Sequence, residues 1–184
     1  EARDFWALGP AADLSVPLLA AMPGGGGGDA GPPLLLADVL YVVADGSMGL
    51  PLHTDAESSF CLTSPETPGL SIWLSLDDVP AETGGGLEVC RTQPPGQTAR
   101  AAQDASCVTY ALRRGDAIVF SKHAPHRSLP WSSAGGVRRA LVARVVQADA
   151  RLAAVRTLPG LVYANGFDGP YLCAHGLAPG DLLN

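Results

Sequence analysis

Two of the residues best suited to bind a metal ion, His53 and Asp55, stand two positions apart, and a third, His126, lies far downstream. Alternate side chains of a β-strand lie on one face, so His53 and Asp55 could present a nitrogen and an oxygen to the same ion. Two histidines and one carboxylate form the facial ligand set of non-haem iron(II) oxygenases. Because a His-x-Asp pair also arises often by chance, the prediction depends on the segments around it.

Those segments follow in a recognisable order. Gly115–Phe120 predicts a tight turn that leads into an apolar strand, and Arg138 lies twelve residues after His126. Upstream, Ser71–Asp78 is an apolar run that carries a tryptophan and ends in Leu-Asp-Asp, and Glu82–Leu87 reads Glu-Thr-Gly-Gly-Gly-Leu. With the His-x-Asp and His-x-Ser pairs, this order resembles the phytanoyl-CoA dioxygenase family of iron(II)- and 2-oxoglutarate-dependent oxygenases.

The resemblance extends from Leu34 to Val146 and implies roles for individual residues. It assigns three ligands to iron(II): His53, Asp55 and His126. It assigns Arg138 to the distal carboxylate of 2-oxoglutarate, with the hydroxyl of Ser128 on the same carboxylate. A guanidinium suits that task because it offers two parallel donors and stays charged at any working pH. Trp73 is implied to line the cosubstrate pocket, and a purely structural tryptophan in the core is the alternative.

Two assignments have a competing residue. His123 could replace His126 as the distal ligand, but His126 carries the His-x-Ser pattern and the family's distance to Arg138. Arg139 points to the opposite face of the same predicted strand from Arg138, so only one of the two arginines can reach the interior. We choose Arg138 on the family spacing; a shift of one residue in the strand would favour Arg139.

The resemblance implies an all-β core with flanking helices, in the form of a double-stranded β-helix, the jelly-roll or cupin-like barrel. It also implies an enzyme that uses iron(II), 2-oxoglutarate and dioxygen, with ascorbate as a further reductant. The expected reaction hydroxylates a small molecule and releases succinate and carbon dioxide. Asp55 favours hydroxylation because related halogenases have Ala or Gly in its place, and desaturation, epimerisation and ring closure are the alternative reactions on the same site. The alternatives are a cupin-like metal enzyme without 2-oxoglutarate and a non-catalytic binding domain on the same fold.

The chain departs from the family pattern in two places. Glu88–Gly96 replaces the usual Pro-Gly-Ser-His stretch after Gly-Gly-Leu, and Trp131 and Ser132 stand where an Asn is common. The first segment commonly borders the substrate, so the substrate cannot be inferred from the resemblance.

Composition limits the other function classes. A net charge of −6 leaves no basic surface for nucleic acid or for anionic lipid. No apolar run reaches the roughly 18 residues of a membrane span, and no signal peptide is visible. We therefore expect a small-molecule substrate and a cytoplasmic location, while the oligomeric state is not indicated.

The four cysteines, Cys61, Cys90, Cys107 and Cys173, have no Cys-x-x-Cys spacing, which argues against a structural zinc site. We expect small buried thiols in a reducing compartment. A cross-link between Cys90 and Cys107 on neighbouring strands is the open alternative.

The 184 residues are expected to form one domain, 1–184. The chain begins with Glu1 and not with Met, so we expect the natural protein to be longer. Residues 24–33 predict a flexible Gly- and Pro-rich loop, and residues 147–184 predict a C-terminal extension. Two helices are expected, at Asp13–Met22 and Asp149–Thr157, and two long functional or disordered loops, at Glu57–Gly69 and Thr92–Ser106. Short apolar segments bounded by Gly, Pro, Asp or Ser predict strands: Leu34–Val43, Leu50–Asp55, Leu70–Leu76, Gly86–Cys90, Cys107–Leu112, Asp116–Ser121 and Arg138–Gln147.

Overall fold

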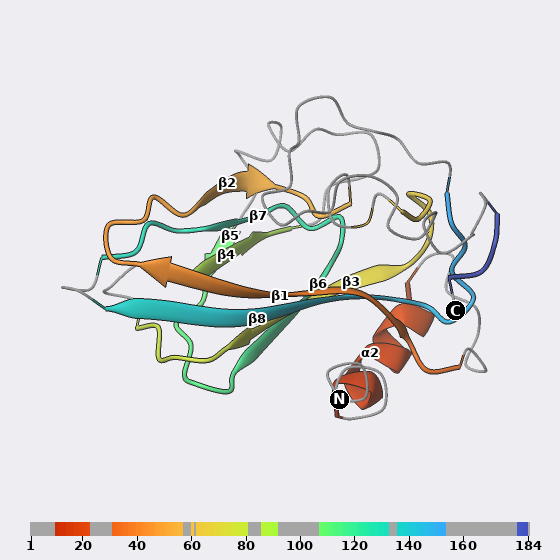
Figure 1. The fold of residues 1–184 in the computed structure, drawn as a ribbon, viewed down its shortest axis with the longest axis horizontal. Coiled ribbons are helices and arrows are strands. Elements are labelled where there is room, and N and C mark those ends of the chain that lie inside the picture. Colours follow the sequence, from red (N-terminus) through yellow and green to blue (C-terminus); the bar gives the residue numbers. More distant parts are fainter. Residues whose placement is uncertain are drawn as a thin grey trace.

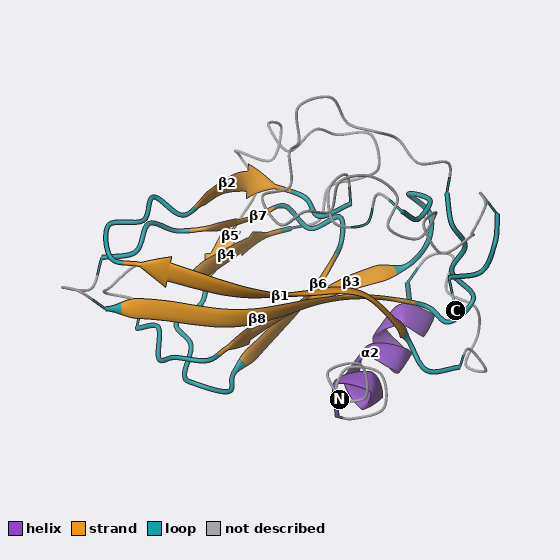
Figure 2. Ribbon diagram, viewed as in Figure 1, coloured by secondary structure: helices purple, strands orange, loops and turns teal. Residues whose placement is uncertain are grey.

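The described residues of the computed structural model form two facing antiparallel sheets with a helix on the outside of one of them (Figure 1). These residues are 10–22, 31–56, 60, 62–80, 86–91, 107–132, 136–153 and 180–183. Strands predominate, as the colouring by secondary structure in Figure 2 makes plain. The predicted all-β core is confirmed, and of the flanking helices that were expected the described residues contain one.

The first sheet has the strand order β1-β8-β3-β6, with every neighbouring pair antiparallel. Its strands are β1 (Leu34–Ala44), β8 (Val137–Val146), β3 (Gly69–Ser75) and β6 (Ala117–Ser121). The second sheet has the order β2-β7-β4-β5 and is also antiparallel. Its strands are β2 (Leu50–His53), β7 (His126–Ser128), β4 (Leu87–Cys90) and β5 (Cys107–Thr109).

Strand β8 illustrates how alternation separates the two faces of the first sheet. Ala140 and Val142 belong to the apolar core between the sheets, whereas Ala143 and Val145 belong to a second apolar cluster that includes Leu19 of helix α2 (Pro10–Ala20). Side chains of a strand point alternately to its two faces, so a single strand contributes to both apolar clusters. Burial of each large apolar side chain stabilises the fold by roughly 1.5–3 kcal/mol. Covering both faces of the first sheet therefore stabilises it.

Several sequence predictions differ from the structure. The strand expected at Leu50–Asp55 ends at His53, and Asp55 lies in the bend that follows. Strand β7, which carries His126, was not among the predicted strands. The helix expected at Asp149–Thr157 is wrong over its described part, residues 149–153, which contain no helix; Arg151 and Leu152 instead form isolated bridges with Leu182 and Thr63. Residues 23–30, 57–59, 81–85, 92–106 and 154–179 lie outside the described residues, with most of the predicted loops and the C-terminal extension.

Two further observations concern the cysteines and the membrane. Cys90 and Cys107 are joined by a disulfide between β4 and β5, where they are direct partners in the register. The expectation of free thiols is wrong for this pair, since neighbouring antiparallel strands bring the two sulfurs together, and the cross-linked alternative holds. Cys61 and Cys173 lie outside the described residues. Within the described part of the chain, no helix is long and apolar enough to cross a membrane.

Gly49 allows β2 to approach the end of β7 closely. Its φ is 75°, and a Cβ at this position would lie 2.1 Å from the carbonyl oxygen of Ser128. Gly46, in the same connection, has a φ of 80°, but a Cβ there would meet nothing within 4 Å. The two glycines therefore share the backbone requirement and differ in the available space.

We expect Gly49→Ala to destabilise the protein by several kcal/mol and Gly46→Ala by only about 1–2 kcal/mol, which is the order of the left-handed backbone cost for an L-residue. The additional loss at Gly49 arises because the backbone of β7 must move. Urea unfolding of both variants measures the difference. Equal losses would mean that the contact with Ser128 is relieved without cost.

Candidate metal centre

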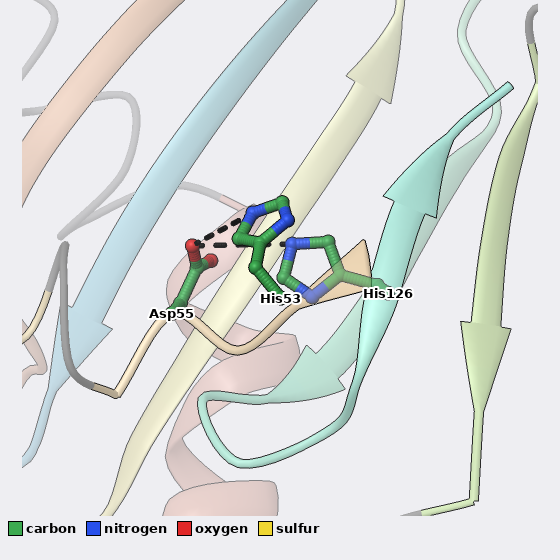
Figure 3. A group of neighbouring side chains, drawn as sticks. All are labelled: His53, Asp55 and His126. Atoms are coloured by element: carbon green, nitrogen blue, oxygen red, sulfur yellow. Dashed lines mark ion pairs between the residues drawn. The ribbon is translucent and has the colours of Figure 1, made fainter. Parts of the chain in front are cut away.

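The structure brings His53, Asp55 and His126 together, with their side chains pointing toward one another (Figure 3). His53 ends strand β2, Asp55 follows it in the bend, and His126 begins strand β7. Nε2 of each histidine lies 3.9 Å from Oδ1 of Asp55. One candidate ligand atom from each residue lies within 4.8 Å of the others, so the set can converge on a single ion.

The backbone fixes the orientation of both imidazoles. Nδ1 of His53 lies 2.8 Å from the carbonyl oxygen of Pro51, and Nδ1 of His126 lies 3.0 Å from that of Ala124. A carbonyl oxygen accepts, so Nδ1 carries the proton and donates, which leaves Nε2 with a free lone pair directed at the shared space. Such outer partners are the usual means of fixing a metal-binding histidine. The donor set and its orientation therefore fit a divalent transition metal.

Asp55 stays ionised despite being buried. Burial opposes the charged form and alone would raise its pKa, but the charge of Arg144, the neighbouring His126 and the hydrogen bond from Ser71 together lower the pKa below its ordinary value. Burial lowers the pKa of His126, and the charge of Asp55 only partly offsets that effect. The site thus favours one carboxylate and one neutral imidazole, the protonation states that bind metal.

A cavity connects this group with two buried arginines. Its lining comes from both sheets: Tyr41, Leu50, His53, Asp55, Trp73, Leu87, Phe120, His126, Ser128, Arg138, Val142 and Arg144. The ring of Phe120 packs on that of His126 with centroids 4.6 Å apart. Apolar and aromatic walls around a few polar groups are typical of small-molecule sites.

Arg138 points into this cavity and Arg139 points away. Arg138 is 2% exposed, and its Nε and Nη1 atoms have no hydrogen-bond partner among the described residues. Its guanidinium lies 5.7 Å from the ring of Trp73, which both lines the cavity and belongs to the core cluster. Arg139 is exposed and pairs with Asp77 through two donors. An unsatisfied buried guanidinium is costly, so the cavity fits an anionic ligand such as a carboxylate.

His123 lies outside this group. Its Nε2 is 3.0 Å from the carbonyl oxygen of Pro65. The second cluster of potential ligands among the described residues consists of Glu88, Cys90 and Cys107. Since both of its sulfurs are in the disulfide, this cluster offers no thiolate to a metal.

Lys122, the only lysine of the chain, anchors the segment that follows Asp55. It is 1% exposed, and its Nζ donates to the carbonyl oxygen of Ser64 at 2.9 Å. Its backbone accepts from Ala56 and donates to Gly69. Burial lowers the pKa of Lys122 to about 8.

The lowered pKa of Lys122 predicts a stability gain at alkaline pH. The folded protein loses this proton near pH 8, whereas the unfolded chain keeps it until about pH 10.5. The unfolded state therefore binds more protons in this window, and stability from this group rises with pH. Relative to Lys122→Met, the free energy of unfolding of the wild type should rise by on the order of 3 kcal/mol between pH 7 and 10.5. Urea titrations across this range measure it; a constant difference would contradict the shifted pKa.

Two polar residues at the site were missed by the sequence reasoning, Ser71 and Arg144. Ser71 Oγ donates to Oδ2 of Asp55, and Nη2 of Arg144 lies 3.6 Å from Oδ1. Arg144 could have been found by alternation, because it is separated from Arg138 by an even number of residues on one strand. Ser71 gave no signal beyond its place in an apolar run.

Comparison with solved structures shows that the chain has the double-stranded β-helix fold of non-haem iron, 2-oxoglutarate-dependent oxygenases. The epimerase SnoN, in a complex with Fe3+, alpha-ketoglutarate and nogalamycin RO, matches with a TM-score of 0.60 at 20% identity, over 92% of this chain and 67% of its own. The alpha-ketoglutarate-dependent carbocyclase SnoK from nogalamycin biosynthesis gives 0.57 at 20% identity, over 83% and 60%. AviO1 from Streptomyces viridochromogenes Tue57 gives 0.59 at 20% identity, over 76% and 58%.

The match thus covers about three-fifths of the length of AviO1 and SnoK. No protein-family model and no curated protein sequence matches the chain.

Proposed function

We propose that this protein is an iron(II)- and 2-oxoglutarate-dependent oxygenase of the phytanoyl-CoA dioxygenase type, which hydroxylates a C–H bond of a small molecule. The observation that carries the proposal is the buried guanidinium of Arg138, whose Nε and Nη1 have no hydrogen-bond partner in the described part of the chain and which lines the same cavity as the three candidate metal ligands. A metal set alone fits many functions. A metal set that shares its cavity with a buried carboxylate receptor fits a 2-oxo dicarboxylic acid.

Each residue then has a defined task. His53, Asp55 and His126 hold iron(II) through two nitrogens and one oxygen. Arg138 binds the distal carboxylate of 2-oxoglutarate, with a hydrogen bond from Ser128, which lines the same cavity. Trp73 and Phe120 keep water away from the reacting groups, which strengthens the polar contacts inside.

The bound iron, 2-oxoglutarate and dioxygen supply the oxidising chemistry, which the protein itself cannot provide. One oxygen atom of dioxygen enters succinate and the other enters the product alcohol, with release of carbon dioxide. The carboxylate of Asp55 favours hydroxylation because it would fill the coordination position that a halogenase leaves open to halide. Relatives in fold include an epimerase and a carbocyclase, so the reaction type depends on how the substrate is presented.

The substrate class is tested by succinate release. Iron-loaded protein is incubated with 2-oxoglutarate and a panel of small metabolites, amino acids and carrier-bound acyl groups, and succinate is measured against an Asp55→Ala control. We expect succinate above the control, increased by one class of compound and accompanied by a product heavier by one oxygen atom. Succinate equal to the control with every compound, in protein that binds iron, would argue against an oxygenase.

A further inference from the structure

The first sheet holds Asp55 by both of its carboxylate oxygens. Oδ2 accepts a hydrogen bond from Oγ of Ser71, and Oδ1 lies 3.6 Å from Nη2 of Arg144. Asp55 is 1% exposed, and Ser71 is 0% exposed. These contacts are therefore shielded from solvent. Polar interactions are stronger in the protein interior than at its surface.

Ser71 and Arg144 are direct partners in the register between β3 and β8. Both strands are interior to the first sheet, with a hydrogen-bonded neighbour on each side. Opposed residues of an antiparallel pair share one face, so the hydroxyl and the guanidinium reach the same side of the sheet. Asp55 itself lies in a bend outside any strand. The carboxylate of Asp55 is thus held by side chains of two neighbouring interior strands.

The two carboxylate oxygens of Asp55 have different contacts. Oδ1 lies 3.9 Å from Nε2 of each histidine and 3.6 Å from Nη2 of Arg144, whereas Oδ2 accepts the hydrogen bond from Ser71. We propose that Ser71 and Arg144 are positioning residues that hold Asp55 so that it binds the metal through Oδ1 alone. This inference rests on the proposed function and concerns two residues to which that function assigns no role.

One-oxygen binding has a consequence for the open coordination positions. A carboxylate that turned to bind through both oxygens would occupy a position that a chelating 2-oxo acid needs. The hydroxyl of Ser71 opposes that rotation because it would lose its acceptor inside the protein. Arg144 opposes it too, because its charge is buried and its Nε has no partner among the described residues.

The test compares metal binding in four variants without any cosubstrate. Ser71→Ala removes the donor, and Arg144→Lys keeps the charge but loses the planar fork. Ser75→Ala is the matched control for the first, because Ser75 is equally buried on the same strand and donates to the backbone of Asp77. Arg139→Lys is the control for the second, on the outer face of β8. The readouts are the Kd for Mn2+, the visible spectrum of the Co2+-loaded protein and the melting temperature of the metal-free protein.

We expect Ser71→Ala and Arg144→Lys to raise the Kd for Mn2+ by about 10–100-fold and to alter the Co2+ spectrum. Each control should keep the wild-type Kd and spectrum. Wild-type affinity in both test variants would overturn the inference, and so would a loss of affinity with an unchanged Co2+ spectrum. If Arg144→Lys does not fold, Ser71→Ala decides alone. Failure of the wild type to bind Mn2+ would instead reject the proposed function.

Discussion

Alanine in place of His53, Asp55 or His126 is expected to abolish stoichiometric binding of iron(II) or Mn2+. Each change removes one of the three candidate ligands that the described residues bring together, whose donor atoms lie within 4.8 Å of one another. The loss of affinity should exceed the roughly 10–100-fold effect of removing a hydrogen-bond partner of a ligand. Equilibrium dialysis with metal analysis, or the Mn2+ electron paramagnetic resonance signal, measures it.

The control for this experiment is His123→Ala. Nε2 of His123 faces the carbonyl oxygen of Pro65, so the substitution should leave metal binding intact. Stoichiometric binding by His126→Ala, together with its loss in His123→Ala, would show that His123 is the distal ligand.

The second large effect is expected on the binding of 2-oxoglutarate, when Arg138 is replaced. Arg138→Ala should weaken the binding of 2-oxoglutarate by roughly 3–5 kcal/mol, since a buried carboxylate would lose its charged partner. That corresponds to about a hundredfold or more in Kd. The affinity for Mn2+ should stay close to that of the wild type, because Arg138 is not in the ligand group. Calorimetric titration of the Mn2+-loaded protein with 2-oxoglutarate measures the first quantity, and titration of the metal-free protein with Mn2+ measures the second.

Arg139→Ala provides the matched control. This neighbouring arginine is exposed and pairs with Asp77, so its removal should leave the Kd for 2-oxoglutarate within about twofold. A large loss with Arg139→Ala and none with Arg138→Ala would mean that the sequence assignment of the inward arginine is wrong.

The sequence predicted the strands well where the apolar pattern and its boundaries agree. Strand β3 is an apolar run that ends before paired aspartates, and strand β8 is a ten-residue, mostly apolar run whose burial alternates over its first half. Strand β7 escaped prediction because His-Arg-Ser is short and polar, and its register comes from β2 and β4. Asp149–Thr157 has helical propensity, but in its described part Leu152 pairs with Thr63 instead. Tertiary pairing outweighed local preference there.

At the site, residue spacing and strand alternation predicted more than the local secondary structure did. They distinguished Arg138, which is buried, from Arg139, which is exposed. They could not place Asp55, since it lies beyond the end of β2 and is oriented by other strands. Ser71 could not be found from the sequence because its importance depends on a residue 16 positions away in the chain. Such long-range contacts exist only after the sheets have formed.

The most direct measurement is the visible absorption of the iron(II) protein on anaerobic addition of 2-oxoglutarate. A 2-oxo acid that chelates ferrous iron gives a weak charge-transfer band, whereas succinate, which lacks the keto oxygen, gives none. We expect a band that saturates at one equivalent in the wild type, needs much more 2-oxoglutarate in Arg138→Ala, and is absent in Asp55→Ala through loss of iron. Iron-loaded wild-type protein without a band at saturating 2-oxoglutarate would contradict it.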